Sequence, residues 1–184
     1  MSRIIIIIFI LNFYNSAISS PKEKIISKME QTQNLNFNFI QTIGDNREDG
    51  YCVIKYSKKI YCEYNNFNKK IIVSNGRSLV IKTTNSGNYY IYPLDKTPLE
   101  YLLDKEFLIS KMKNLEPRLI DNKYLNFEIF ENNNKINIFF DIKNLTLVGW
   151  QTEDIYQNLI ITFISSVKLN QEVDEKNFIL PKNN

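Results

Sequence analysis

The sequence predicts a mainly β protein of the α+β class, built as a half-open antiparallel β-barrel of about eleven strands. Short segments of alternating polar and apolar residues follow one another from residue 36 to residue 167, and hairpin signals such as Asn75-Gly76 separate them. Helical patterns occupy two short stretches, 21–33 and 97–103. Because so many strands tend to curl, we expect short helices to form a lid over an apolar cavity on the concave side. A barrel filled by its own side chains is the alternative, which the pattern leaves open.

The first 19 residues have the layout of a secretory signal peptide. A single positive charge, Arg3, precedes the apolar run from Ile4 to Leu11, and the small-residue site Ala17-Ile18-Ser19 follows. The run is too short to span a bilayer as a helix. We therefore expect a cleaved signal peptide at 1–19 and one soluble, exported domain at 20–184, with no cysteine at the cleavage site to carry a lipid. A buried N-terminal strand or an uncleaved anchor is the alternative.

The composition favours a binding protein over an enzyme. The formal net charge is +3 without a basic cluster, so we expect no nucleic-acid partner. The chain has no histidine, which excludes histidine-based zinc sites and Ser-His-Asp triads. Nucleotide-binding and hydrolase motifs are absent, and Asp95, Asp141 and Asp154 fit solvated turns better than a catalytic site. We therefore predict no catalytic residue, no metal and no cofactor.

Two capping patterns define the predicted helices. The first helix, 21–33, begins with the capping box Ser20-Pro21-Lys22-Glu23. Its apolar stripe consists of Ile25, Ile26 and Met29. The second helix begins at Thr97-Pro98, with Thr97 as the N-cap. Its apolar face consists of Leu99, Leu102 and Leu103.

The predicted strands are connected mostly by short hairpin turns, which indicates an antiparallel meander. They span residues 36–39, 51–56, 59–64, 70–74, 78–82, 88–93, 124–131, 135–142, 145–150, 158–167 and 178–180. The stretch 105–120 is harder to interpret. Within it, the apolar run Phe107–Met112 fits a strand, and Glu116-Pro117 marks a loop.

Cys52 and Cys62 lie on the two arms of one predicted hairpin. If Lys55 pairs with Lys59, Cys52 faces Cys62 directly, at a separation that permits a bridge. In an exported chain this pair favours a disulfide over a metal or redox site, because the spacing is not C-x-x-C. Strand alternation predicts that the concave face of this hairpin carries Cys52, Ile54, Ile60, Cys62 and Tyr64.

Several short motifs follow one another along the mature chain. They are Phe39-Ile40-Gln41, the hairpin from Gly50 to Tyr64, Val73-Ser74-Asn75-Gly76 followed by Leu79, and Thr97-Pro98-Leu99 with Leu102 and Leu103. More loosely, they continue with Leu145–Trp150, Asp154 and Phe178–Pro181. In this order the motifs resemble the bacterial outer-membrane lipoprotein carrier proteins (LolA-like).

The resemblance implies a half-barrel with a helical lid in the periplasm. It also implies that acylated lipoproteins are carried from an inner-membrane releasing transporter to an outer-membrane receptor, and we expect a monomer. A periplasmic regulatory or lipid-binding protein that uses the same half-barrel to bind a membrane-anchored signalling protein is the alternative.

The residues expected to line the cavity and lid are Phe39, Cys52, Ile54, Ile60, Cys62, Tyr64, Ile72, Leu79, Leu99, Leu102 and Leu103. The family resembled usually has Arg-Pro in the hairpin, where the arginine latches the lid. This chain has Tyr56-Ser57 at those positions, which makes Tyr56 the candidate latch, with fewer hydrogen-bond donors than arginine.

Overall fold

The computed structural model describes residues 19–56, 58–154 and 157–183, so the predicted signal peptide lies outside the described residues except for Ser19. One eleven-stranded sheet has the order β6-β5-β4-β3-β2-β1-β11-β10-β9-β8-β7. The strands are β1 (Asn34–Ile43), β2 (Asn46–Lys55), β3 (Lys59–Tyr64), β4 (Lys70–Asn75), β5 (Ser78–Thr83), β6 (Tyr89–Pro93), β7 (Arg118–Ile120), β8 (Tyr124–Glu131), β9 (Asn134–Asp141), β10 (Leu147–Glu153) and β11 (Leu159–Leu169). The α-helices are α1 (Pro21–Gln31), α2 (Leu99–Leu103) and α3 (Lys105–Asn114), and the 3-10 helices are η1 (Leu94–Lys96) and η2 (Glu175–Phe178).

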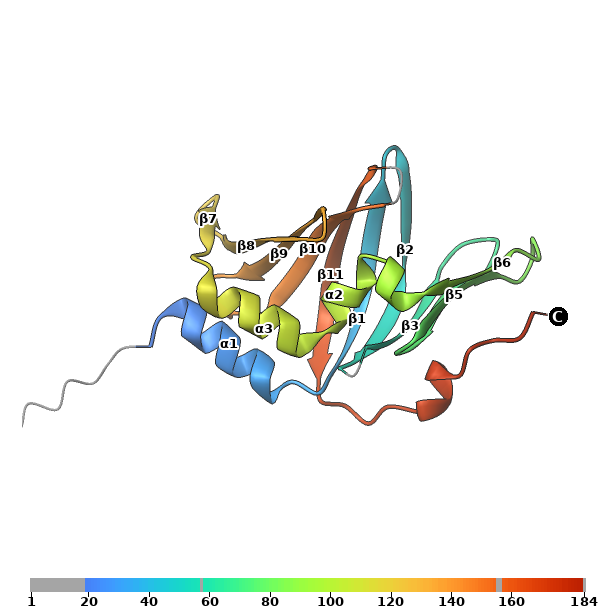
Figure 1. The fold of residues 1–184 in the computed structure, drawn as a ribbon, viewed down its shortest axis with the longest axis horizontal. Coiled ribbons are helices and arrows are strands. Elements are labelled where there is room, and N and C mark those ends of the chain that lie inside the picture. The colour runs from blue at the N-terminus through green and yellow to red at the C-terminus, as the bar shows by residue number, and fades with distance from the viewer. Residues whose placement is uncertain (1–18, 57, 155–156, 184) are drawn as a thin grey trace, which may run out of the picture.

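The sheet is antiparallel, curved and open, which confirms the predicted half-barrel architecture. Its edges are β6 and β7, and no pairing joins them within the described part of the chain. Strand β1 lies in the middle, between β2 and β11, so that β2–β6 and β7–β11 form two arms. The helical segment between the arms crosses the concave side, where α3 lies alongside α1 (Figure 1).

The main hydrophobic core fills the concave side, because alternate residues of each strand point into it. On β1, Leu35, Phe37 and Phe39 are buried, and Asn38 between the two phenylalanines is exposed. The ring of Phe37 meets that of Trp150 edge-on, with centroids 6.0 Å apart. This contact joins β1 to β10, so the core connects the middle of the sheet to its C-terminal arm.

Helix α1 begins with the predicted capping box. The Ser20 hydroxyl accepts a hydrogen bond from the Glu23 amide at 3.2 Å, and the Glu23 carboxylate accepts one from the Ser20 amide at 2.7 Å. The helix ends at Gln31, two residues before the predicted end, where the Thr32 hydroxyl donates to the Lys28 carbonyl at 2.7 Å. The stripe of Ile25, Ile26 and Met29 is buried on the core. Burial of this stripe fixes the helix across the sheet.

The C-terminal segment covers the outer face of the β2–β6 arm instead of forming the predicted strand at 178–180. Phe178 ends η2 and is buried, and η2 lies against β3 and β4. Glu175 forms ion pairs with Lys55 and Lys59, which point outward from β2 and β3. The outer-face row beneath carries the buried residues Val53, Val73 and Val80, one on each of three strands. The segment therefore buries Phe178 on the face of the sheet. Strands pair through backbone hydrogen bonds at the edge of a sheet, so a segment lying on the face does not become a strand.

Two other sequence-based assignments around the lid were wrong. The run Phe107–Met112 lies inside α3 and is not a strand, because Asp104 caps this helix by accepting the Phe107 amide at 2.9 Å. Thr97 does not cap α2: its hydroxyl donates to the Leu94 carbonyl at 2.8 Å within the preceding turn. The structure has a short edge strand, β7, that was not predicted, and it lacks the strand predicted at 178–180. The predicted number of eleven strands is therefore right, but one of the eleven is a different segment.

The helices that the structure describes are all too short or too polar to cross a membrane. Residues 19–56, 58–154 and 157–183 contain no grouping of acidic and cysteine side chains suited to hold a metal ion.

Candidate functional site

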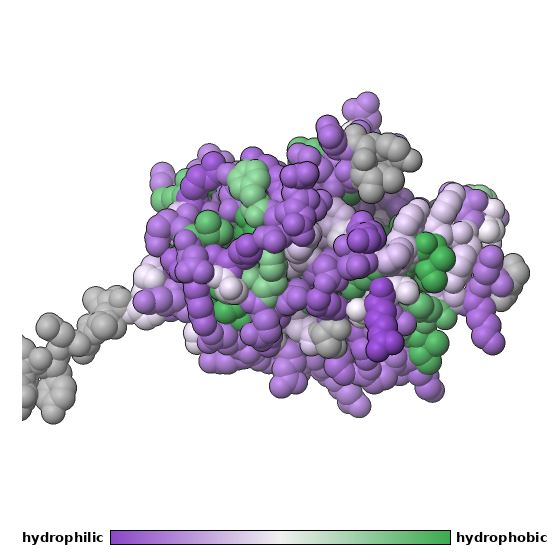
Figure 2. Space-filling view, viewed as in Figure 1, coloured by the Kyte–Doolittle hydropathy of each residue, from purple (hydrophilic) through white to green (hydrophobic). Residues whose placement is uncertain are grey.

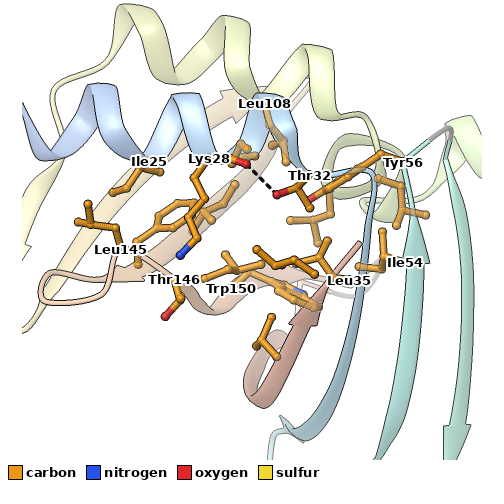
Figure 3. A pocket seen from close by; sticks show the side chains of 18 of the residues that line it. Ile25, Lys28, Thr32, Leu35, Ile54, Tyr56, Leu108, Leu145, Thr146 and Trp150 are labelled. Carbon is orange, nitrogen blue, oxygen red and sulfur yellow. Dashed lines mark hydrogen bonds between the residues drawn. The ribbon is translucent and has the colours of Figure 1, made fainter. Parts of the chain in front are cut away.

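A small apolar cavity lies between the helices and the concave face of the sheet (Figure 3). Its volume is about 50 Å³. The helices contribute Ile25, Met29, Leu99, Leu102, Leu103 and Leu108 to its wall. The strands contribute, among others, Leu35, Ile54, Ile60, Ile138, Phe140 and Trp150. Apart from the Trp150 indole, the polar side chains of the lining are Lys28, Thr32, Tyr56 and Thr146. The site is thus suited to a hydrocarbon group and offers few hydrogen bonds.

The structure divides the predicted cavity residues into two groups. The first group lines the cavity and comprises Ile54, Ile60, Leu99, Leu102 and Leu103, and the predicted latch Tyr56 lies in the same wall. The second group belongs to the packed interior along β1 and the β2–β6 arm, outside the cavity wall, and comprises Phe39, Cys52, Cys62, Tyr64, Leu79 and the partly buried Ile72. The prediction therefore extended the cavity too far along this arm, because it assumed that inward-pointing side chains leave a space between them.

Close side-chain packing fills this arm. The rings of Phe39 and Tyr64 meet with centroids 4.8 Å apart, and the Tyr64 hydroxyl donates to Gln41 Oε1 at 3.1 Å. Burial, followed by the nearby Glu48 carboxylate, raises the pKa of Tyr64 well above its usual range. Gly50 lets the Phe39 ring approach, since a Cβ at that position would lie 2.9 Å from the ring and 2.1 Å from the Glu63 carbonyl oxygen. These contacts pack the described residues at this end of the half-barrel closely together.

Sequence reasoning missed the contribution of α1 and of the C-terminal arm to the cavity. Ile25 and Met29 of α1 line it, although their helical spacing indicated only a buried stripe. Ile138 and Phe140 of β9 and Trp150 of β10 line the opposite side. The alternation within β9 could have identified Ile138 and Phe140, because the predicted strand places both side chains on the same face of the sheet.

The cysteines of the β2–β3 hairpin are joined by a disulfide. The register pairs Cys52 directly with Cys62, with their Cα atoms 4.1 Å apart. Both side chains are buried on the concave side, next to the cavity residues Ile54 and Ile60. The bridge therefore ties together the two strands that carry this part of the cavity wall.

A protein-family model described as outer membrane lipoprotein carrier protein LolA matches residues 30–180. The chain belongs to the LolA family. This match confirms the family that the ordered motifs resemble. No curated protein sequence matches the chain.

Solved structures are similar to this LolA-family chain at low sequence identity. An uncharacterized conserved protein from Thermus thermophilus aligns with a TM-score of 0.52 and 6% identity, over 89% of this chain and 96% of its own. The LolA superfamily protein NE2245 from Nitrosomonas europaea has a TM-score of 0.45 and 11% identity, over 88% and 99% of the two chains. A MucA/MucB complex from Pseudomonas aeruginosa has a TM-score of 0.49 and 9% identity, over 90% of this chain and 62% of the matching chain of the complex. The first likeness supports the shared fold, and identities this low say nothing of function.

In this LolA-family chain, Lys58 joins the β2–β3 hairpin to the lid, the helical segment of α2 and the start of α3. Its amine forms an ion pair with Glu100 of α2 and a second, at 3.0 Å, with Asp104 at the start of α3. The hydrogen bonds from Lys58 to these two carboxylates raise the pKa of its amine. Tyr56, the predicted latch, has its ring in the cavity wall, and no hydrogen bond joins its hydroxyl to α2 among the residues described. Lys58 follows the predicted latch by only two positions and was not recognised, because a single lysine in a turn carries no pattern of its own.

Proposed function

We propose that this LolA-family chain is a non-enzymatic periplasmic carrier that shields the acyl chains of lipoproteins and moves them from an inner-membrane releasing transporter to an outer-membrane receptor. The observation that carries the proposal is the apolar cavity beneath α2. An acyl chain gains about 0.8 kcal/mol for each methylene group that leaves water, so such a cavity can bind lipid without any polar recognition. The family match over residues 30–180 supports the same role.

The described conformation corresponds to a closed carrier. Its cavity of about 50 Å³ is far smaller than the roughly 300–1,000 Å³ of typical ligand sites. The face that carries the helices is mostly hydrophilic, with hydrophobic side chains in scattered groups (Figure 2). Cargo must therefore displace α2, a five-residue helix whose polar attachment to the β2–β3 hairpin is through Lys58. A lid of this kind can open and close if its two states differ by only a few kcal/mol.

A release assay tests the carrier proposal. The chain from Ser20, which contains every described helix and strand, is added to spheroplasts that make a tagged lipoprotein, and the supernatant is analysed for a one-to-one complex. We expect a complex with the wild-type chain and none with Leu102→Glu or Ile60→Glu, because either change places a charge in the apolar wall.

The matched control is Leu119→Glu, the same substitution at an exposed leucine of β7. It should release the lipoprotein as well as the wild type does, and circular dichroism should show native folding for all variants. A folded wild-type chain that releases no lipoprotein, or a Leu102→Glu variant that still does, would overturn the proposal.

A further inference from the structure

The cavity wall contains one charged side chain among the described residues, Lys28 of α1. We infer that this cavity also accepts acyl lipids with an anionic head group, a carboxylate or a phosphate, which Lys28 binds. This inference rests on the proposed function, because it requires that acyl chains enter the cavity. It adds anionic acyl lipids as a class of cargo. Burial of hydrocarbon alone would not favour these lipids over neutral ones.

The position of Lys28 fits a head-group contact. Its side chain runs from α1 down to the turn between β9 and β10, and its nitrogen lies near the labelled residues Leu145 and Thr146 (Figure 3). The amine is therefore at the border of the cavity, and the hydrocarbon wall starts immediately beside it. A chain placed against Leu145 and Trp150 would have its polar end at this amine.

The amine of Lys28 has unused hydrogen-bonding capacity. It donates to the Asn144 carbonyl at 3.3 Å, and a lysine ammonium has three donors. No carboxylate of the described residues lies within ion-pair distance of it, whereas two other lysines of the helical layer are paired: Lys22 with Glu116 at 2.9 Å and Lys113 with Glu30 at 3.0 Å. Lys28 is thus a cation at an apolar site that the protein does not itself neutralise.

The acidic residue of the nearby turn is directed elsewhere. Asp141 accepts hydrogen bonds from the Asn144 amide at 3.1 Å and the Lys143 amide at 2.9 Å. These bonds lower the pKa of its carboxyl group, so the charge of Asp141 stabilises its own turn. An incoming carboxylate or phosphate would meet the Lys28 ammonium without displacing an ion pair. Charge-assisted hydrogen bonds of this kind are about twice as strong as neutral ones.

Competition between twelve-carbon amphiphiles tests the inference. The chain from Ser20 is loaded with a neutral fluorescent naphthylamine probe, which is then displaced by dodecanoate, dodecyl phosphate, dodecanol or dodecylamine below their micelle concentrations. We expect each anion to displace the probe at about one tenth of the dodecanol concentration, and dodecylamine to be the weakest competitor. The two anions, compared with each other, show whether a carboxylate or a phosphate is preferred.

Variants of two lysines on α1 separate charge recognition from packing. Lys28→Met should bring the anions to the dodecanol level, and Lys28→Arg should keep their advantage. Lys24→Met is the matched control, because Lys24 is exposed on the same helix and does not line the cavity; it should behave as the wild type.

The outcomes distinguish this inference from the proposed function. Equal displacement by dodecanoate and dodecanol, or an anion advantage that survives Lys28→Met, would overturn the role of Lys28 and leave an acyl-binding cavity. Failure of the probe and of all four amphiphiles to bind a folded chain would overturn acyl binding itself.

Discussion

Lys58 joins the β2–β3 hairpin to the lid through charge, two positions after the predicted latch Tyr56. Its amine reaches Glu100 on α2 and Asp104 at the N-terminus of α3. A lysine ammonium is a compact charge that can pair with both acids, but it lacks the planar fork of a guanidinium. The three side chains are each partly exposed, with exposed fractions of 34%, 20% and 28%. Partly exposed ion pairs contribute about 1 kcal/mol or less each, which is compatible with the lid opening that the proposed function requires.

Removal of this charge should make the lid easier to open. We expect Lys58→Met to take up a neutral acyl probe about two- to fivefold faster than the wild type in stopped-flow fluorescence, because the closed state loses up to roughly 1 kcal/mol. Lys58→Arg keeps the charge and should take up the probe at nearly the wild-type rate. An unchanged rate in Lys58→Met would show that hydrophobic packing of Leu102 and Leu103, and not the ion pairs, keeps α2 closed.

The pH dependence of this contact has a defined sign. The pKa of Lys58 is raised above its ordinary value of 10.5 by hydrogen bonds to Glu100 and Asp104. Its contribution to stability is therefore fully present below pH 10.5 and is lost as the pH rises through the raised pKa. The difference in uptake between wild type and Lys58→Met should accordingly persist at neutral pH and disappear only in strong alkali.

At the scale of elements, the β2–β3 hairpin combines the covalent bridge with part of the cavity wall. The bridge joins residues 10 positions apart, so it restricts a short loop of the unfolded chain. In the chain-entropy account such a loop contributes about 2–3 kcal/mol to stability. Both sulfur atoms also fill space in the core, since the cysteines are 4% exposed.

Loss of the bridge should destabilise the fold without closing the cavity. The double variant Cys52→Ala/Cys62→Ala should have a free energy of unfolding lower by about 2–3 kcal/mol in urea denaturation followed by circular dichroism. A reducing agent should lower the stability of the wild type by a similar amount and leave the double variant unchanged. If the double variant proved as stable as the oxidised wild type, the bridge would have no stabilising role.

The C-terminal segment shows how an element can stabilise the sheet away from the site. Phe178 packs on the outer face of the arm whose inner face carries Ile54 and Ile60. Lys59 lies with its amine 5.6 Å from the centre of the Phe178 ring and also pairs with Glu175. The arm is therefore covered on both faces, although its predicted alternation indicated one buried face only.

On the scale of the whole molecule, the fold combines one continuous sheet with a short helical segment that covers its concave side. The sheet is continuous through eleven strands, with β1 paired on both sides. Helices α1 and α3 contact each other, whereas α2 is short and contacts mainly η1 and α3. Opening can thus be confined to the lid segment between β6 and α3, and the strand pairing can remain unchanged.

Ligand binding should therefore alter hydrogen exchange at the lid and not in the sheet. We expect the backbone amides of residues 99–103 to exchange faster when dodecanol fills the cavity, because the chain takes the space that Leu102 and Leu103 occupy. Amides of β1 and β11 should keep their protection, which provides an internal control in the same mass-spectrometric measurement. Unchanged or stronger protection of α2 at saturation would argue for a ligand that enters without lid movement.

Local sequence determined much of the architecture. Alternation and turn residues predicted most of the strands, because the two-residue period of a strand and the backbone demands of a tight turn are local properties. The direct pairing of Cys52 with Cys62 followed from the same reasoning, as did the capping box of α1. The ordered motifs also led to the family that the match over residues 30–180 establishes.

Tertiary structure decided what happens to short apolar runs and to isolated charges. Phe107–Met112 became part of a helix through the Asp104 cap and its packing beside α1, and 178–180 did not form a strand because Phe178 packs on a sheet face instead. Lys58 meets a partner 42 residues away, and Lys28 reaches a carbonyl 116 residues away. Such contacts depend on how the arms curve and where the helices cross, and the same curvature leaves a small cavity on one side and close packing on the other. Periodicity specifies which face a side chain points to, whereas only the folded chain specifies what it meets there.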